Sequence, residues 1–197
     1  MTSNILKHDF KISRIVRNER NKHSSFVVWL TGLSGSGKST LASALEQQLF
    51  GHGLNVYILD GDNIRLGINK DLDFTVEGRK ENIRRVAEIS KLMMDVGIIV
   101  ITSFISPFKE DREIAKSIIG SADFIEVFVN CPFGVCEKRD VKGLYAKARS
   151  GDIKHFTGIS SAYEAPEHPD VIINTDGTSV GRCIENIYQV IDKKIRL

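Results

Sequence analysis

The stretch Gly-Leu-Ser-Gly-Ser-Gly-Lys-Ser-Thr at residues 32–40 constrains this chain more than any other feature. It fits the pattern G-x-x-x-x-G-K-[ST], whose glycines let the backbone turn tightly and point its N–H groups at an anion. An apolar run before it (26–31) and a helix-forming run after it distinguish it from a Gly/Ser-rich linker. We therefore predict a nucleotide-phosphate site, the phosphate loop, in which Lys38 supplies positive charge and the Ser39 hydroxyl a ligand for Mg²⁺. Its nine residues are Gly32, Leu33, Ser34, Gly35, Ser36, Gly37, Lys38, Ser39 and Thr40.

The chain has the size and composition of one soluble α/β domain. It has 197 residues, of which 42% are hydrophobic and 26% charged. A net charge of +2 is too small to favour nucleic acid as the main partner, although it leaves room for a local anionic substrate. No apolar run is long enough for a membrane span, and no signal-peptide pattern is present. The three cysteines are odd in number and lack metal-ligand spacing, so we expect reduced thiols in the cytoplasm.

The order of predicted elements favours a three-layer α/β/α fold with a five-stranded parallel sheet. We expect strands at 26–31, 54–59, 97–102, 124–130 and 170–174, alternating with helices that include 79–96, 108–119 and 181–195. Residues 64–76 are expected to be irregular. Ser106 and Pro107 suit the N-cap and first position of the helix over 108–119. Residues 25–197 form the predicted kinase-like domain, and the polar, basic residues 1–24 an N-terminal arm or, alternatively, a transit peptide.

Two further segments carry candidate chemistry. Asp60 and Asp62 follow the second strand, at the edge of a parallel sheet where ligands bind, and can serve a metal and a nucleophile. The alternative is a turn whose aspartates only cap a helix. Residues 140–168, the lid segment, interrupt the strand–helix alternation and lie in a basic region. They suggest either a lid that closes over phosphates or a solvated surface helix.

A phosphate loop alone does not distinguish kinases from GTPases, ATPase motors or nucleotide-dependent switches. The chain has no Asn-Lys-x-Asp motif for guanine, no apolar strand ending in Asp-Glu, and no partner domain. A short chain with carboxylates after the second strand and a basic late segment is typical of a small-molecule kinase.

More specific stretches are similar to the adenylyl-sulfate kinase (APS kinase) family over about residues 26–170. They are Leu-Asp-Gly-Asp-Asn-Ile-Arg-Leu-Gly at 59–67, Arg-Lys-Glu-Asn-Ile-Arg-Arg at 79–85, Ser-Phe-Ile-Ser-Pro-Phe at 103–108, Arg-Asp-Val-Lys-Gly-Leu-Tyr at 139–145 and Gly-Asp-Ile-Lys-His-Phe-Thr-Gly at 151–158. The chain departs from the family at three positions: Leu66, where His or Gln is common, Asp73, where Gly is common, and Gly78, where Asp is common. These departures bear on substrate affinity and not on the reaction.

The resemblance implies phosphoryl transfer from ATP to the ribose 3′-hydroxyl of adenylyl sulfate. Such a transfer needs in-line positioning and neutralisation of charge, which Lys38, the loop N–H groups and Mg²⁺ on Ser39 and Asp60 would supply. Asp62 would orient or deprotonate the 3′-hydroxyl. The substrate residues that the resemblance implies are Asp62, Arg65, Phe74, Arg79, Asn82, Ile105, Ser106, Lys142 and Phe156. Among them Arg65, Arg79 and Asn82 would hold the phosphosulfate, Phe74 and Phe156 would enclose the adenine beside Ile105, and Lys142 would reach in from the lid segment.

Several alternatives stay open. In the family, Ser106 has been assigned as a phosphoserine intermediate, but a serine at a helix N-terminus can donate to an anion without being phosphorylated. A kinase for a sugar or a nucleoside phosphate would share the fold, but it gives no reason for the two phenylalanines together with Arg65, Arg79 and Asn82. A catalytically inactive module that regulates a sulfurylase is opposed by the intact Lys38, Ser39, Asp60 and Asp62. The resemblance also implies a homodimer and allows association with ATP sulfurylase.

Overall fold

A five-stranded parallel sheet forms the centre of the structure, as the sequence predicts. The computed structural model describes residues 6, 8 and 10–197; the part of the expected N-terminal arm at 1–5, 7 and 9 lies outside the described residues. The strands lie side by side in the order β2-β3-β1-β4-β5. They are β1 (Val27–Thr31), β2 (Val56–Asp60), β3 (Ile99–Ser103), β4 (Phe124–Asn130) and β5 (Val171–Asn174).

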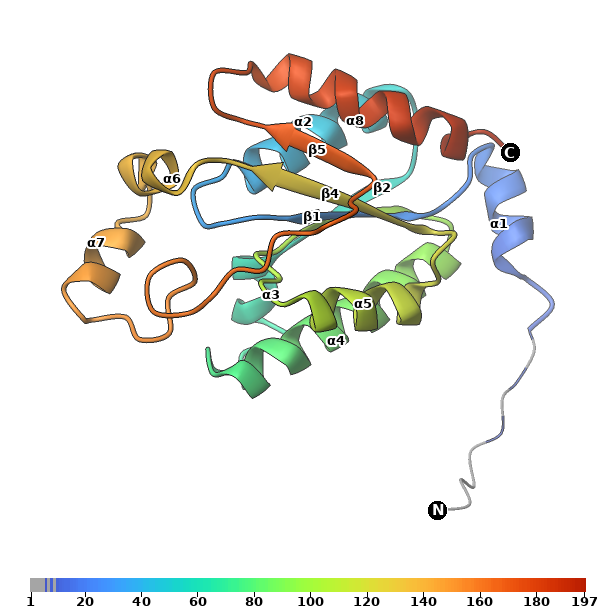
Figure 1. Cartoon of the computed structure of the whole chain (residues 1–197). Coiled ribbons are helices and arrows are strands. Elements are labelled where there is room, and N and C mark those ends of the chain that lie inside the picture. The colour runs from blue at the N-terminus through green and yellow to red at the C-terminus, as the bar shows by residue number, and fades with distance from the viewer. Residues whose placement is uncertain (1–5, 7, 9) are drawn as a thin grey trace.

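Two layers of helices cover the sheet and complete the expected three-layer fold (Figure 1). One face packs against α2 (Lys38–Gly51) and α8 (Val180–Ile195), and the other against α4 (Val76–Asp95) and α5 (Lys109–Ile119). Alternate residues of the central strand enter different cores: Val28 and Leu30 lie with α2 and α8, whereas Val27 and Trp29 lie with α4 and α5. All five residues of β1 are buried, and its first four are apolar, as expected for a strand that is covered on both faces of the sheet.

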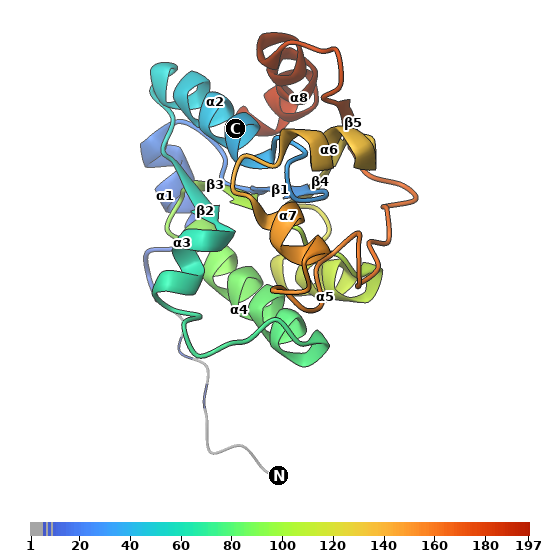
Figure 2. The ribbon, with the colours of Figure 1, turned by 90° about the vertical axis from the view of Figure 1, so that its left-hand side faces the viewer.

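The carboxyl ends of β1, β2 and β3 meet at one edge of the sheet. Leu30 of β1 and Asp60 of β2 both lie in register with Ser103 of β3, so the phosphate loop emerges beside Asp60. The helices that follow β1 and β3 cover opposite faces of the sheet, which makes this boundary a switch point where ligands bind in parallel sheets. The short helices α3 (Gly61–Leu66), α6 (Phe133–Arg139) and α7 (Leu144–Arg149) lie at the same edge, which faces the viewer in Figure 2.

Three local expectations were wrong. The segment 64–76 is not irregular at its start, because α3 extends to Leu66, and α4 begins at Val76 with Thr75 as its N-cap, before the expected position 79.

Ser106 is not the N-cap of α5, and Pro107 is not its first residue. That helix begins at Lys109, whose N–H donates to the Glu164 carboxylate at 2.7 Å. A carboxylate distant in sequence thus replaces the local serine cap, which sequence proximity cannot reveal.

Part of the expected N-terminal arm is helical and contacts the domain. Helix α1 (Arg14–Asn21) begins with Ser13 as its N-cap. The Arg14 guanidinium forms two hydrogen bonds to the Asp123 carboxylate, at 2.6 and 2.8 Å, just before β4. In the part of the chain that the structure describes, none of the helices combines the length and the apolar character that a bilayer span needs.

Candidate functional site

The phosphate loop lies close to backbone that only glycine can approach. A Cβ atom on Gly32 would stand 2.5 Å from the Val129 carbonyl oxygen, and one on Gly35 would stand 2.8 Å from the Cys136 carbonyl oxygen. Gly37 then adopts a φ of 102° as the N-cap of α2, and the first N–H groups of that helix, which have no partner within it, are available to an anion. The nine predicted nucleotide residues therefore form one curved segment, with Ser39 and Thr40 exposed in the first turn of α2.

Lys38 lies across this loop with its ammonium group buried. Its Nζ donates to the carbonyl oxygens of Gly32 at 2.9 Å and Leu33 at 2.8 Å. Burial lowers the pKa of Lys38 from 10.5 to about 8, although the nearby carboxylates of Asp60 and Asp62 oppose that shift. An incoming phosphate would offer this ammonium stronger acceptors than the two carbonyl oxygens, because charge-assisted hydrogen bonds are the stronger kind.

Three side-chain oxygens gather beside the loop in a way that suits Mg²⁺. The Ser39 hydroxyl donates to the Asp60 carboxylate at 3.0 Å and lies 3.2 Å from the Ser103 hydroxyl. Among residues 6, 8 and 10–197, no group of three or more His, Cys, Asp or Glu side chains could hold a metal. A magnesium ion that shares its coordination with phosphates and water needs only one or two protein oxygens of this hard type. Ser39 and Asp60, the two predicted ligands, therefore fit the ion.

Asp60 also caps α3 and thereby positions Asp62. The Asp60 carboxylate accepts a hydrogen bond from the Asp62 N–H at 3.0 Å, so the capping role and a metal role coexist on its two oxygens. Asp62 itself points to solvent from the first turn of α3 and forms an ion pair with Lys142 of the lid segment. The predicted base and the predicted lid lysine, distant in sequence, are therefore neighbours in space.

The lid segment is attached to the phosphate loop at its N-terminal side. The Tyr145 hydroxyl donates to the Ser34 carbonyl oxygen at 2.9 Å. Arg139, the last residue of α6 and the one directly before the lid segment, donates to the Gly35 carbonyl oxygen at 3.3 Å. Asp140 accepts from two backbone N–H groups at the start of α7, at 3.0 Å each. Sequence reasoning did not assign a role to Tyr145; the signal that could have identified it is a tyrosine at the end of the family-like stretch 139–145.

The predicted acceptor residues Arg65, Phe74 and Arg79 contact one another. The Arg65 guanidinium carbon lies 4.3 Å from the centre of the Phe74 ring, and that of Arg79 lies 5.7 Å from it. Arg79 donates to the Phe74 carbonyl oxygen at 3.0 Å and to the His155 carbonyl oxygen at 2.7 Å. Burial lowers the pKa of both arginines, which nevertheless stay charged at neutral pH. Two cations and an aromatic face thus lie together, suited to an anionic nucleotide.

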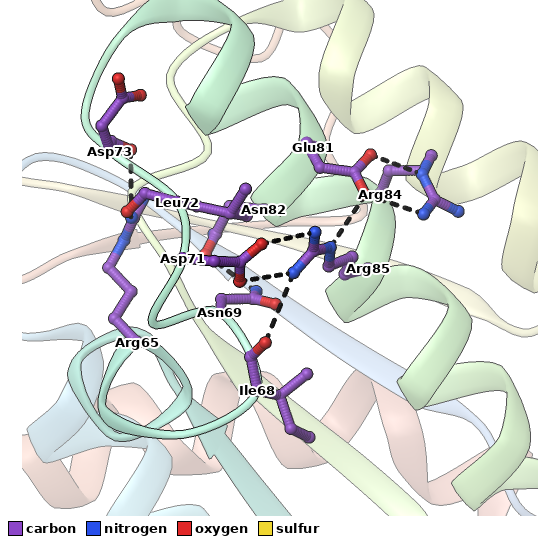
Figure 3. A network of polar contacts seen from close by, with 10 residues as sticks. All are labelled: Arg65, Ile68, Asn69, Asp71, Leu72, Asp73, Glu81, Asn82, Arg84 and Arg85. Carbon is purple, nitrogen blue, oxygen red and sulfur yellow. Dashed lines mark hydrogen bonds and ion pairs between the residues drawn. The ribbon is translucent and has the colours of Figure 1, made fainter.

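The other predicted acceptor residues lie around this group. Asn82 is buried on α4, and its side-chain oxygen accepts from Asn69 at 3.0 Å (Figure 3). Phe156 is buried against the Tyr145 ring, with 4.9 Å between the ring centres, and stands next to the His155 carbonyl that Arg79 contacts. Arg79 therefore reaches from the Phe74 side to the Phe156 side. The enclosure of an adenine between the two phenylalanines stays a prediction.

Ser106 is held by residues that sequence reasoning missed. Its hydroxyl accepts from the Trp29 indole at 3.2 Å, and its carbonyl oxygen accepts from the Arg112 guanidinium at 2.8 Å. Ser106 is only 2% exposed and has a φ of 38°, a conformation that non-glycine residues seldom adopt. The adjacent Ile105 is half-buried and its carbonyl oxygen accepts from Thr31 at 2.7 Å. Trp29 and Arg112 lacked a sequence signal, because a strand tryptophan and a helical arginine are ordinary residues.

Comparisons with known proteins agree on one family. The family model described as adenylylsulphate kinase matches residues 24–174. A probable adenylyl-sulfate kinase of Halalkalibacterium halodurans is 56% identical over 184 residues, which is 93% of this chain and 91% of that protein. The adenylyl-sulfate kinase of Staphylococcus carnosus is 50% identical over 98% of both chains.

Solved structures give the same result. The Mycobacterium tuberculosis APS kinase CysC, solved in complex with AMPPNP and APS, superposes with a TM-score of 0.83 at 44% identity. The match covers 86% of this chain and 98% of that one. A gluconokinase of Sinorhizobium meliloti shares the fold at a TM-score of 0.54, but with 16% identity it supports the architecture alone.

Proposed function

Because this chain belongs to the adenylylsulphate kinase family, we propose that it transfers the γ-phosphoryl group of ATP to the ribose 3′-hydroxyl of adenylyl sulfate. The products are ADP and 3′-phosphoadenylyl sulfate, and the reaction activates sulfate for assimilation. The observation that carries the proposal is the two-sided site at one sheet edge. A phosphate loop with Lys38 stands on one side, and two arginines around Phe74 stand on the other.

On the donor side, the loop N–H groups and Lys38 bind the β- and γ-phosphates of ATP. Lys38 exchanges the carbonyl oxygens of Gly32 and Leu33 for phosphate oxygens, which places its charge where charge develops during transfer. Ser39 and Asp60 would hold Mg²⁺, which when bound neutralises phosphate oxygens and fixes their orientation.

On the acceptor side, Arg65, Arg79 and Asn82 bind the phosphosulfate, while Phe74, Phe156 and Ile105 enclose the adenine. The cation–aromatic stack of Arg65 on Phe74 supports this assignment, because it pairs a face for the base with a charge for the oxyanion. Asp62 then accepts the proton of the 3′-hydroxyl. Lys142, its ion-pair partner, moves with the lid segment toward the phosphates.

The decisive experiment is a coupled ADP-release assay with Mg-ATP. Adenylyl sulfate, adenosine 5′-monophosphate, gluconate and shikimate are offered as acceptors in turn. We expect rapid turnover with adenylyl sulfate alone, because only that acceptor has both an adenine and a phosphosulfate. Turnover of another acceptor without turnover of adenylyl sulfate would refute the proposal and leave only the fold. ATP binding without turnover of any acceptor would favour the regulatory module.

The role of Asp62 is tested with Asp62→Ala in the same assay. A lost general base lowers kcat by about 10²- to 10⁴-fold. ATP affinity should change little, since the Asp62 carboxylate is paired with the lid lysine Lys142 and has the smallest of the named effects on the pKa of Lys38. Calorimetric titration with ATP measures that affinity, and a parallel loss of ATP binding would contradict the assigned role. Asp62→Asn, which keeps the size of the side chain, serves as the matched variant.

We also propose that the enzyme is a cytoplasmic homodimer, with association to ATP sulfurylase as a further proposal. The three cysteines Cys131, Cys136 and Cys183 are free thiols, the state that the cytoplasm maintains. A hollow of about 440 Å³ beside α1 and the edge strand β2 is lined by the exposed side chains of Phe50, Tyr57 and Val96, which a second copy could cover. Analytical ultracentrifugation of the wild type and of Tyr57→Glu tests the dimer.

A further inference from the structure

The loop between α3 and α4, residues 67–75, supports the acceptor side of the site. Arg65 donates from one nitrogen to the carbonyl oxygens of Leu72 at 3.0 Å and Asp73 at 3.1 Å. Arg79 donates to the carbonyl oxygen of Phe74 at 3.0 Å. The loop thus carries the aromatic ring and also supplies the acceptors that orient both arginines. Its position therefore decides where these three groups point.

Apolar packing contributes little to holding this loop. Its side chains at 68, 70, 71, 73 and 74 are exposed, with Ile68 at 59% and Phe74 at 56%, and only Asn69 is fully buried. A loop that buries so little apolar surface depends on polar contacts for its conformation. The contacts from its neighbouring helix are therefore the ones to identify.

Arg85 of α4 makes the main polar connection to the loop. Two of its guanidinium nitrogens donate to the two oxygens of the Asp71 carboxylate, at 2.8 and 2.9 Å, and one lies 3.4 Å from the Ile68 carbonyl oxygen (Figure 3). This bidentate geometry fixes the orientation of the Asp71 carboxylate relative to the Arg85 guanidinium as well as the distance between them. The hydrogen bonds from Arg85 hold the pKa of Asp71 below its ordinary value, so the carboxylate is charged at neutral pH.

Two further contacts of α4 support this connection, one to Arg85 itself and one directly to the loop. Glu81, one turn earlier on α4, accepts from Arg85 at 2.8 Å and fixes the arginine from the helix side. Asn82, in the same turn, accepts from Asn69 of the loop at 3.0 Å. The loop is therefore joined to α4 at Asn69 and at Asp71 (Figure 3), and both of these residues lie just before the segment 72–74 that ends in Phe74.

From these contacts we propose that Arg85 is a positioning residue for the acceptor, an inference that rests on the proposed function. Through Asp71 it holds the 67–75 loop, and through the loop it orients Arg65, Phe74 and Arg79 for adenylyl sulfate. Its side-chain contacts are with Asp71 and Ile68 of the loop and with Glu81 of α4, and it takes no part in ATP binding or in proton transfer.

The neighbouring Arg84 provides a matched control. It has the same charge and lies on the same helix, yet its partners are Glu81 and Glu88 of α4 itself, and its side chain is 47% exposed against 29% for Arg85. Arg84→Ala therefore removes a guanidinium from α4 without touching the loop. Any effect of Arg85→Ala that Arg84→Ala does not share belongs to the loop contact.

The test separates binding of the two substrates. Arg85→Ala should raise the KM for adenylyl sulfate by about 10- to 100-fold, because a small displacement of binding groups has effects of this size. The KM for ATP should stay within about twofold, as should every parameter of Arg84→Ala. Arg85→Lys keeps the charge but cannot form the bidentate contact, so its KM for adenylyl sulfate should lie between those of the wild type and Arg85→Ala. The exchanged pair Asp71→Arg with Arg85→Asp should recover part of the loss.

Amide hydrogen exchange provides a readout that does not depend on turnover. Arg85→Ala should speed exchange in residues 67–75 and leave the strands of the sheet unchanged. The positioning role would be overturned if amide exchange in residues 67–75 is unchanged in Arg85→Ala. It would also be overturned if exchange is faster while the KM for adenylyl sulfate is unchanged. Equal increases in both KM values would overturn it as well. If the wild type does not phosphorylate adenylyl sulfate, the proposed function fails and the acceptor named here fails with it, whereas the exchange result still decides whether Arg85 holds the loop.

Discussion

Lys142 of the lid segment forms an ion pair with Asp62 at the start of α3, and thereby joins the lid directly to the proposed base. Their side chains are 59% and 69% exposed, so the pair contributes at most about 1 kcal/mol to stability. A contact this weak can be exchanged for phosphate oxygens when ATP binds. The pair therefore indicates where Lys142 stands before catalysis and does not hold the domain together.

Replacing Lys142 by alanine tests this interpretation. We expect kcat/KM for adenylyl sulfate to fall by about 10- to 100-fold, the equivalent of one charge-assisted hydrogen bond in the transition state. The melting temperature should stay within about 4 °C of the wild type. Lys147→Ala, which removes an exposed lysine from α7 of the same segment, is the control. An equal loss in both variants would mean that general positive charge, and not the Asp62 neighbour, matters.

Burial of Lys38 predicts a specific pH dependence of ATP binding. In the free protein its pKa is lowered to about 8, whereas bound phosphates favour the charged form and raise the pKa. ATP binding should therefore take up a proton above pH 8, and ATP affinity should fall as the pH rises, with a limiting slope of about tenfold per pH unit.

Calorimetry in two buffers of different ionisation enthalpy counts that proton. Lys38→Arg is the control, since a guanidinium stays charged over the whole range and should abolish both the proton uptake and the slope. A wild-type affinity that is flat between pH 8 and 10 would show that the Lys38 ammonium is not buried in the free protein.

The buried contacts of Ser106 predict that it acts without being phosphorylated. Its hydroxyl accepts from Trp29 and is 2% exposed, so it is not presented to ATP as a nucleophile. Ser106→Ala should lower kcat/KM by no more than about tenfold, the effect of one lost hydrogen bond. An obligatory covalent intermediate would instead cost about 10⁴-fold or more. Mass spectrometry after incubation with Mg-ATP alone should detect no phosphoryl group on Ser106, and stoichiometric labelling would refute this prediction.

Because Gly78 lies close to Asp73, we predict that Gly78→Ala lowers the free energy of unfolding, although helix propensity alone predicts an increase. Propensity alone predicts that Gly78→Ala stabilises α4 by about 1 kcal/mol. An added Cβ, however, would overlap the Asp73 carboxylate and stand 2.7 Å from the Asp73 backbone carbonyl oxygen. We therefore expect a loss of about 1–3 kcal/mol in the free energy of unfolding, measured by urea denaturation.

Two further variants separate these effects. Gly181→Ala, in α8, has open space around the added Cβ and should be neutral or stabilising. Asp73→Gly combined with Gly78→Ala should recover part of the loss, because it removes the carboxylate and leaves only the carbonyl contact. These two positions are among those at which the chain departs from the family pattern, and the close approach makes them interdependent.

The sequence by itself determined the parts of this protein that depend on local backbone chemistry. The phosphate loop is continuous along the chain, so its glycines, Lys38 and Ser39 could be identified without a structure. The five strands and their parallel direction were predictable, because buried apolar strands that alternate with helices favour a parallel sheet. The order of the strands within the sheet came only from the structure. The family was recognisable for the same reason, since its motifs are short and continuous.

Only the tertiary structure decided the relationships between distant residues. Asp62 and Lys142 are 80 positions apart, and no pattern along the chain pairs them. Glu164 caps α5 in place of Ser106, and Arg112 and Trp29 hold Ser106 from two other elements. The sequence alone predicts that Arg85 is a solvated charge on a helix, whereas the structure places Asp71 of the 67–75 loop beside it. The physical reason is that a side chain's partner depends on how elements pack, whereas turns and strands depend on the dihedral angles and hydrogen bonds of neighbouring residues.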